Sequence, residues 1–377
     1  AIDELEAENL TPPSVTGGYL LKIDRLDPGD AGLTAGGVTL GHVDPKEREL
    51  RLTQRRPQQT YIQNYMRTFA TALTSATWLH PTIGYRGYLD VDAAIDFHVL
   101  EVLSGNVDAL VLSTYLHKPR GGKITFGPHW DFDRALGSTD GRDSNPRLWA
   151  TGPFFGAAWW NRMFTDKAFW QQWVDRWQEL RETHFALGNL HGLIDELAGE
   201  VRQAQPREYA KWRVGLRGGS YESEVRLMKN WLSNRIDFID RQLTQPPRFS
   251  QLGGPISPGF VLHLTNPTNA ALYYTLNGSD PRSPTGGISA NALSYAGPII
   301  LDRNARVVAR AFDATKRQTG GPPSVSWTPW SRPIAATFVV ATPRLMLTEI
   351  MFHPDPPPEG DPYAESDFEY LEFANLR

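Results

Sequence analysis

Three aspartates occur in a pattern that suits phosphoryl transfer. Asp131 and Asp133 lie two residues apart, after a short apolar segment and before Gly137. In extended backbone, residues i and i+2 project to the same face, so both carboxylates could approach one site. Two carboxylates held together repel each other, and a hard divalent cation such as Mg²⁺ relieves that repulsion. Asp108 follows a predicted helix end, where its carboxylate could orient or deprotonate an attacking hydroxyl.

The neighbouring polar residues have both functional and structural interpretations. An aspartate pair near a turn often only caps the backbone, which is the alternative to a metal site. His129 could be a general base, and Lys123 could contact phosphate or be a charge at a hairpin tip. Arg134 could pair with the aspartates or touch phosphate. The Arg55-Arg56 doublet could contact an acidic substrate, although a solvated surface position explains it equally simply.

The elements that must position these residues are helices and short strands in residues 1–245, which indicates an α+β fold. Apolar residues recur three and four apart in four segments, as in amphipathic helices. These predicted helices are Asp90–Leu103, Phe169–Leu180, Leu190–Val201 and 222–243. Asp90 or Asp92 would cap the first, and Gly188-Asn189 would separate the second from the third.

Six of the twelve tryptophans lie between residues 149 and 177. An exposed tryptophan cluster could stack on sugars. Several of these residues recur at helical spacing, however, which favours packing in a hydrophobic core.

Residues 88–137 contain several short motifs in a distinctive order: Asn106-x-Asp108, the Tyr115-Leu116 strand, a glycine-rich hairpin ending in Lys123, and Trp130-Asp-Phe-Asp133 followed by Gly137. In this combination the segment resembles the spore coat protein CotH kinase family, a group of atypical protein-kinase-like proteins of bacteria. Residues 17–21 resemble the strand that closes the upper lobe in that family. Residues 159–243 resemble its C-terminal helices.

The resemblance implies that the γ-phosphate of ATP is transferred to a protein hydroxyl with the help of Mg²⁺ or Mn²⁺. It gives Asp108 the role of the catalytic-loop aspartate. It makes Asp131, with Asp133 beside it, the metal-binding aspartate. Ser113 occupies a position where the family often has an asparagine that binds a second metal, so it would contribute a hydroxyl oxygen instead. The remaining candidates for contacts with nucleotide phosphates are Arg134 and Lys123.

The family's glycine-rich and lysine-bearing nucleotide segments are expected upstream of Gly17. The chain begins Ala-Ile-Asp, so we expect a truncated kinase-like domain that lacks most of its N-terminal lobe. A rival interpretation is a catalytically silent, kinase-like extracellular protein with a structural or adhesive role. A third is carbohydrate binding or processing, which the spacing of Asp131 and Asp133 fits poorly because glycosidases need two separated carboxylates.

Residues 246–343 change to short β-branched and aromatic segments divided by turn residues, which predicts an immunoglobulin-like β-sandwich. The predicted strands are 259–265, 271–276, 306–312 and 336–340. Residues 273–282 include an Asn-Gly turn and resemble the C-terminal accessory domain of chitobiase and β-hexosaminidase. That resemblance implies a non-catalytic module.

Residues 344–377 are rich in acidic residues and proline. The segments 345–354 and 369–375 resemble the first strands of a lamin-tail domain. By association, these modules suggest a large multi-domain bacterial protein that is secreted or belongs to the cell envelope. Association with the cell surface or with polysaccharide would fit that setting.

The composition narrows the functional classes further. The chain of 377 residues has no cysteine, which excludes disulfides, thiolate metal sites and a cysteine nucleophile. A net charge of −4 argues against a general nucleic-acid-binding protein, because such proteins carry a basic surface. No segment is apolar for long enough to predict a transmembrane helix. We therefore expect no nucleic-acid partner, and the CotH resemblance implies a protein substrate.

Overall fold

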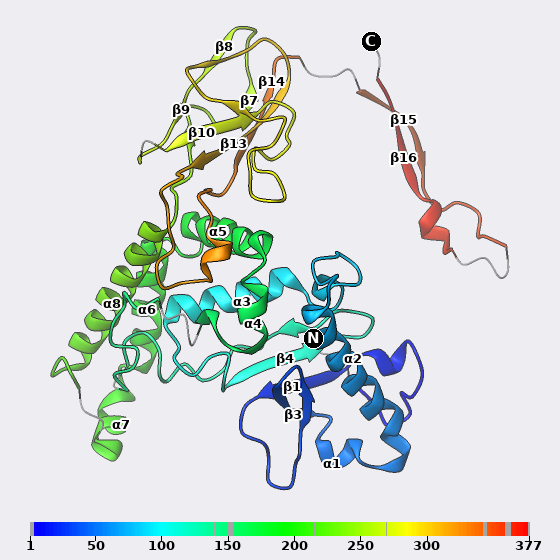
Figure 1. The fold of residues 1–377 in the computed structure, drawn as a ribbon, viewed down its shortest axis with the longest axis vertical. Coiled ribbons are helices and arrows are strands. Elements are labelled where there is room, and N and C mark those ends of the chain that lie inside the picture. Colours follow the sequence, from blue (N-terminus) through cyan, green and yellow to red (C-terminus); the bar gives the residue numbers. More distant parts are fainter. Residues whose placement is uncertain are drawn as a thin grey trace.

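The computed structural model describes residues 4–138, 140–149, 154–213, 216–268, 270–341, 345–358 and 363–375. Figure 1 shows helices around an antiparallel sheet, a β-rich part that adjoins helix α5 (Lys167–Glu182), and a C-terminal hairpin that lies apart from both. The mixture of helices and strands confirms the predicted α+β class.

The first part of the chain contains a five-stranded sheet with the order β2-β3-β1-β4-β5. Its strands are β1 (Tyr19–Ile23), β2 (Leu33–Ala35), β3 (Val38–Asp44), β4 (Thr114–Lys118) and β5 (Thr125–Phe126). Buried residues alternate with partly exposed ones along β1 and β4, as expected for strands with one face on a core. Strand β1 pairs antiparallel with β4 from Tyr19 opposite Lys118 to Ile23 opposite Thr114. The sheet therefore joins the start of the chain to the segment that carries the candidate site.

Helices pack on this sheet and on each other. The α-helices are α1 (Glu47–Leu50), α2 (Arg56–Thr74), α3 (Val91–Ser104), α4 (Ala158–Met163), α5, α6 (Leu187–Val201), α7 (Gln205–Trp212) and α8 (Tyr221–Gln242). Short 3₁₀ helices cover Ser14–Thr16, Thr53–Arg55, Tyr85–Gly87, Ser324–Ser326 and Glu365–Phe368. None of the helices in the described residues has both the length and the apolar character needed to cross a membrane.

The helix boundaries agree with the sequence in α3 and differ in α6. The Asp90 carboxylate accepts a hydrogen bond from the Ala93 amide at 3.0 Å and caps α3, as predicted. The prediction that Gly188 and Asn189 precede α6 is wrong, because α6 begins at Leu187. Asn189 instead lies in the first turn, and its side-chain amide donates to the Thr183 carbonyl at 2.8 Å. It therefore ties α6 to the loop before it rather than capping the helix with its own oxygen.

The tryptophan-rich segment forms part of the main hydrophobic core. Trp170, Trp173 and Trp177 are completely buried on α5. Their rings stack in succession, with centroids 4.9 Å and 5.7 Å apart. These residues are therefore core residues and not an exposed sugar-stacking surface.

A second hydrophobic core lies in the β-rich part. Its main sheet has the order β11-β10-β13-β14-β7, and the pairs β12-β8 and β6-β9 form two smaller sheets. The strands are β6 (Arg248–Phe249), β7 (Gly254–Pro255), β8 (Phe260–Leu262), β9 (Leu264–Thr265), β10 (Ala271–Thr275), β11 (Leu293–Ser294), β12 (Ile299–Leu301), β13 (Ala305–Phe312) and β14 (Ile334–Val339). All four predicted strands occur, although the first divides into β8 and β9. The immunoglobulin-like assignment itself stays a prediction.

Arg310 on β13 connects the two cores. Its guanidinium is almost fully buried and donates to both carboxylate oxygens of Asp175 on α5, at 2.7 and 2.8 Å. It also donates to both oxygens of Asp280 at 2.7 Å and to the Ser331 carbonyl at 2.6 Å. These contacts use all five guanidinium N–H groups. The β-rich part is therefore fixed against helix α5.

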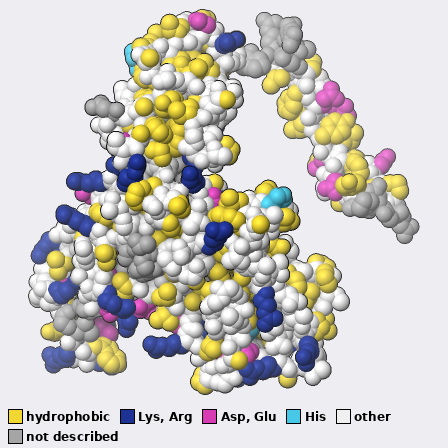
Figure 2. All heavy atoms as spheres, viewed as in Figure 1, with side chains coloured by type: hydrophobic (Ala, Val, Ile, Leu, Met, Phe, Trp, Pro, Cys, Tyr) yellow, Lys and Arg dark blue, Asp and Glu magenta, His cyan; other side chains and the backbone are white. Residues whose placement is uncertain are grey.

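The C-terminal segment forms an antiparallel hairpin of β15 (Leu345–Met351) and β16 (Tyr370–Asn375). Several of its large apolar side chains are exposed, and Figure 2 shows them on the hairpin surface. The lamin-tail resemblance stays a prediction for this segment.

Candidate functional site

The connection between α3 and β4 carries Asp108 and Ser113. Helix α3 ends at Ser104, and the Gly105 that follows has a φ of 65°, which glycine readily adopts. The Asn106 side-chain oxygen then accepts a hydrogen bond from the Asp108 amide at 3.3 Å, and the Asp108 carbonyl accepts one from Leu112 at 2.9 Å. Ser113 adopts a φ of 49° immediately before β4. This connection places Ser113 immediately before β4, with Asp108 in the loop that leads to it.

Asp131 reaches the same place from the other side of a hairpin. Strands β4 and β5 pair with Leu116 opposite Phe126, so the residues before β4 lie near the residues after β5. The Ser113 hydroxyl donates to the Asp131 carboxylate at 3.2 Å. Two of the predicted metal ligands are therefore brought together by the fold.

Asp133 is oriented differently from the prediction. The predicted extended segment through both aspartates is absent, because β5 ends at Phe126 and Asp131 has a φ of 64°. This left-handed residue breaks the alternation that would place Asp131 and Asp133 on one face. The exposed Asp133 carboxylate lies 3.9 Å from the Arg134 Nε instead.

Asp108 is held by two arginines, of which Arg142 was not a sequence-based candidate. Arg134 Nη1 lies 3.1 Å from one oxygen of Asp108, and Arg142 Nη1 lies 3.0 Å from the other. Arg142 also donates through Nε to Asp140 at 2.5 Å, and this hydrogen bond lowers the pKa of the Asp140 carboxyl. The Asp140-x-Arg142 spacing close to the Trp-Asp-Phe-Asp motif was the signal available in the sequence.

A buried carboxylate that the sequence analysis missed links the two site segments. Glu101 on α3 is 2 % exposed and accepts hydrogen bonds from Asn106 at 3.0 Å and from His129 Nδ1 at 3.1 Å. Burial raises the pKa of the Glu101 carboxyl, and the two hydrogen bonds oppose that rise. His129 also stacks on Phe97, with ring centroids 4.6 Å apart. These contacts give His129 a packing role. The sequence signal for Glu101 was a glutamate between the apolar pairs Val99-Leu100 and Val102-Leu103.

Lys123 and Arg55 have other partners. The Lys123 ammonium donates to the Arg86 carbonyl at 2.8 Å. It lines a surface pocket with Asp90 and Asp92 near the start of α3, whereas Asp108 follows the other end of that helix. Arg55 donates to the Leu5 carbonyl at 3.3 Å, at the start of α2. None of these contacts connects Lys123 or Arg55 with Asp108, Asp131 or Asp133.

An aromatic pair adjoins the Ser113–Asp131 contact. Trp130 is 58 % exposed and lies edge-on to Tyr115, with ring centroids 6.2 Å apart. Each aromatic residue is one or two positions from one of the oxygen-bearing residues. Lys22 lies opposite Tyr115 in the β1–β4 pairing. The Ser113 and Asp131 oxygens, which could bind a metal ion, thus lie beside an aromatic surface formed by Tyr115 and Trp130.

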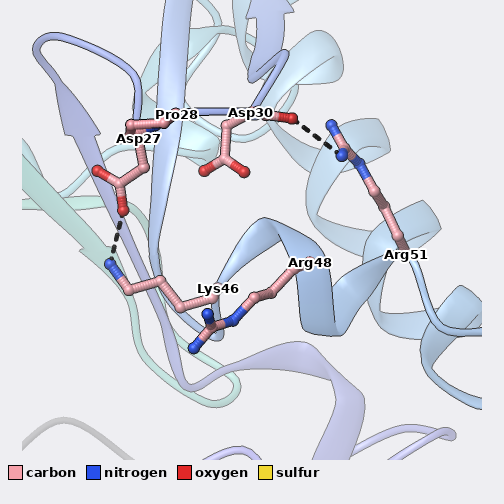
Figure 3. A pocket seen from close by; sticks show the side chains of 7 residues that line it. Asp27, Pro28, Asp30, Lys46, Arg48 and Arg51 are labelled. Atoms are coloured by element: carbon pink, nitrogen blue, oxygen red, sulfur yellow. Dashed lines mark hydrogen bonds and ion pairs between the residues drawn. The ribbon is translucent and has the colours of Figure 1, made fainter.

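A separate polar pocket of about 340 Å³ lies between the turn before β2 and helix α1. Figure 3 shows Lys46 pointing to Asp27, 2.9 Å away. Arg51 donates to the backbone carbonyl of Gly29 at 3.1 Å. Hydrogen bonds from Lys22 and Lys46 lower the pKa of Asp27 to about 2. Two of the charges that line this pocket, Asp27 and Lys46, pair with each other, and Arg51 pairs with Glu47. We assign the pocket no ligand.

Ser113 and Asp131 could supply some of the ligands of a divalent cation. Asp131 and Ser113 supply a carboxylate and a hydroxyl oxygen side by side, and oxygen is the ligand that Mg²⁺ prefers. Within the part of the chain that the structure describes, no group of three or more His, Cys, Asp or Glu residues is arranged to hold a metal ion alone. Mg²⁺ commonly binds through one or two carboxylates together with substrate phosphates and water. The protein would therefore supply some of the ligands, and a bound polyphosphate the others.

Comparison with known proteins agrees with the main resemblance. Residues 3–239 match the family model described as CotH kinase protein, and residues 262–320 match the one described as Fn3 associated. The first match covers more than half of the chain, so the chain belongs to the CotH kinase protein family. A search of the curated proteins found no match. The segment that resembles the chitobiase accessory domain lies within the Fn3-associated match. The chitobiase-type resemblance is therefore not confirmed and stays a prediction.

Proposed function

We propose that this protein is an atypical protein kinase that transfers the γ-phosphate of ATP to a protein hydroxyl. The observation that carries the proposal is the Ser113–Asp131 oxygen pair at one end of the β4–β5 hairpin. Asp108 is linked to the same region through its contact with Arg134, three residues after Asp131. Membership of the CotH kinase family supports the same activity.

Each site residue would contribute a distinct part of the chemistry. A divalent cation held by Asp131 and Ser113 would neutralise charge on the nucleotide phosphates. One oxygen of Asp108 would orient the acceptor hydroxyl and take up its proton. The acceptor oxygen then bonds to the γ-phosphorus, the bond from phosphorus to the β,γ-bridging oxygen breaks, and ADP leaves. The exposed ring of Trp130 beside Tyr115 offers a stacking surface for the nucleobase.

The alternative is a catalytically silent, kinase-like structural or adhesion protein. Two observations favour it. Both carboxylate oxygens of Asp108 are already paired with arginines, and Ser113 provides no amide oxygen for a metal. We propose for either case a secreted or cell-envelope location in a multi-domain bacterial protein, with retention on insoluble polysaccharide as the test of surface association.

The experiment that separates the two functions is transfer of label from γ-labelled ATP in the presence of Mn²⁺ or Mg²⁺. The wild-type chain is compared with Asp108→Asn, Asp131→Asn and the control Asp237→Asn, which changes an exposed aspartate paired with Arg241 on α8. The kinase proposal expects label on protein with the wild type and the control, and at least about a hundredfold less with the two site variants. Absence of label from all four folded proteins would favour the silent protein.

A further inference from the structure

A polar pocket of about 300 Å³ lies where the β-rich part meets the start of helix α5. Its lining comes from three separate segments: Lys167, which is the first residue of α5, the turn that contains Arg282 and residues 285–287, and residues 326–329. No acidic residue is among the described residues that line it. None of the lining residues belongs to the candidate kinase site. The pocket is therefore distinct from that site, and its charged side chains are all basic.

Arg282 is a buried cation that makes few hydrogen bonds. It is 9 % exposed, and its Nη1 and Nη2 atoms donate to the backbone carbonyls of Ser283 and Lys167, each at 3.2 Å. Its Nε has no hydrogen-bond partner among the described residues. Two of its five guanidinium N–H groups are therefore used, and both go to neutral acceptors.

The charge of Arg282 is not neutralised by a carboxylate. In the part of the chain that the structure describes, Asp175 and Asp280 form their ion pairs with Arg310 instead. Burial, followed by repulsion from Arg310, lowers the pKa of the Arg282 guanidinium, and attraction to nearby carboxylates opposes this only in part. An arginine still remains protonated at neutral pH. Because a buried charge without a partner is costly, this position favours a bound counterion.

Lys167 places a second positive charge beside Arg282. A Cβ added at Gly286 would lie 3.5 Å from Arg282 Nη2 and 3.9 Å from Lys167 Cδ, so both side chains adjoin this glycine. Lys167 is exposed, and the adjacent Asp166 pairs with Arg86 rather than with it. Two neighbouring cations without acidic partners suit an anion that carries more than one negative charge.

We infer that this pocket binds a small tetrahedral oxyanion, phosphate or sulfate, between Lys167 and Arg282. The Thr285 hydroxyl also lines the pocket and can donate a hydrogen bond to the anion. The bound anion is the counterion of Arg282. Because the lining residues come from both sides of the junction, it also strengthens the attachment of the β-rich part to α5. This inference goes beyond the proposed kinase function and does not depend on it.

The first test locates the anion on the wild-type chain by amide hydrogen exchange. Exchange is compared in sodium phosphate and in sodium chloride at equal ionic strength, without nucleotide or divalent metal. Phosphate should slow exchange in residues 283–287 and 326–329 and at the start of α5, because a ligand that binds only the folded junction suppresses its local opening. Exchange in residues 131–143 should be unchanged. This measurement uses no variant, so it does not depend on the folding of one.

The second test is calorimetric titration of phosphate into the wild type, Lys167→Ala, Arg282→Gln and the control Lys211→Ala. Lys211 is also exposed, on α7, and its ammonium lies over the Trp212 ring rather than in this pocket. Lys167→Ala should weaken phosphate binding about tenfold, which corresponds to about 1.4 kcal/mol. Arg282→Gln should weaken it further, and Lys211→Ala should bind as the wild type does. Thermal unfolding without phosphate checks that each variant is folded.

Three results would overturn the inference. The first is equal exchange in phosphate and chloride, which would mean that the pocket has no preference for the oxyanion. The second is protection confined to residues 131–143, which would place the anion at the arginines beside Asp108. The third is an unchanged phosphate affinity in Lys167→Ala. The proposed kinase function is judged separately by label transfer, so either proposal can fail without the other.

Discussion

Replacement of Ser113 by asparagine should strengthen metal binding at the candidate site. Ser113 has a φ of 49°, and asparagine is several times more common than most residues in this left-handed region. The substitution should therefore leave the turn before β4 unstrained. It would also place an amide oxygen, a good ligand for Mg²⁺ and Mn²⁺, next to Asp131 at the position where the family often has asparagine.

The size of the effect follows from the contact that Ser113 makes. Its hydroxyl donates one hydrogen bond of 3.2 Å to an exposed carboxylate, and such a bond contributes about 0.5–1 kcal/mol. Ser113→Ala should therefore raise the half-saturating Mn²⁺ concentration about two- to fivefold. Ser113→Asn adds a ligand of comparable strength and should lower that concentration about three- to tenfold.

The assay is calorimetric titration of ATP into wild-type, Ser113→Ala and Ser113→Asn proteins at a series of Mn²⁺ concentrations. Thermal unfolding without metal checks that the three proteins are equally folded. The reasoning about this site is refuted if Ser113→Asn needs as much Mn²⁺ as the wild type while Ser113→Ala is also unchanged. In that case the hydroxyl would be a neighbour of Asp131 with no part in metal binding.

Three further predictions concern the framework of the site. Arg310→Ala leaves two carboxylates without their buried partner and should lower the free energy of unfolding by about 3–5 kcal/mol in urea titrations; a loss below about 1 kcal/mol would contradict this role. Gly137→Ala places a Cβ 2.6 Å from the Trp231 ring, whereas Gly141 has a similar positive φ but open space around it. Gly137→Ala should therefore lower the free energy of unfolding by about 1–3 kcal/mol more than Gly141→Ala does. Equal losses would attribute the effect to backbone strain alone. Glu101 has a pKa raised by burial, so its contribution to stability is fully present below the ordinary value near 4.5 and is lost as pH rises through the folded value. Thermal unfolding across pH should therefore show Glu101→Gln gaining on the wild type as pH rises, and parallel curves would refute the assignment.

The sequence predicted the periodic elements better than the site geometry. Helix α3 was predictable because Asp90 caps an apolar repeat, and α5 because its tryptophans recur at helical spacing. Strand β2 was missed because three residues carry too little pattern. Strand β3 was missed because its buried residues do not alternate regularly with exposed ones. The prediction that Asp131 and Asp133 share one face of an extended segment was wrong, because Asp131 adopts a positive φ that its residue type does not reveal.

The contacts of the site depend on tertiary structure that local patterns do not encode. Ser113 and Asp131 meet because β4 and β5 pair, which could be expected from the hairpin. Arg142 reaches Asp108 across 34 residues of sequence, and no local pattern predicts that contact. Glu101 was hidden for a similar reason, because its partners Asn106 and His129 come from two different loops.

The most direct test of the metal–nucleotide site is ATP binding by wild-type and Asp131→Asn proteins, measured by calorimetry with Mn²⁺ and again with EDTA. The account predicts that the wild type binds ATP when Mn²⁺ is present and loses that binding in EDTA. It also predicts that Asp131→Asn binds at least about tenfold more weakly in Mn²⁺. Equal binding by the two proteins, or wild-type binding that is unaffected by EDTA, would contradict the assignment of Ser113 and Asp131 as metal ligands.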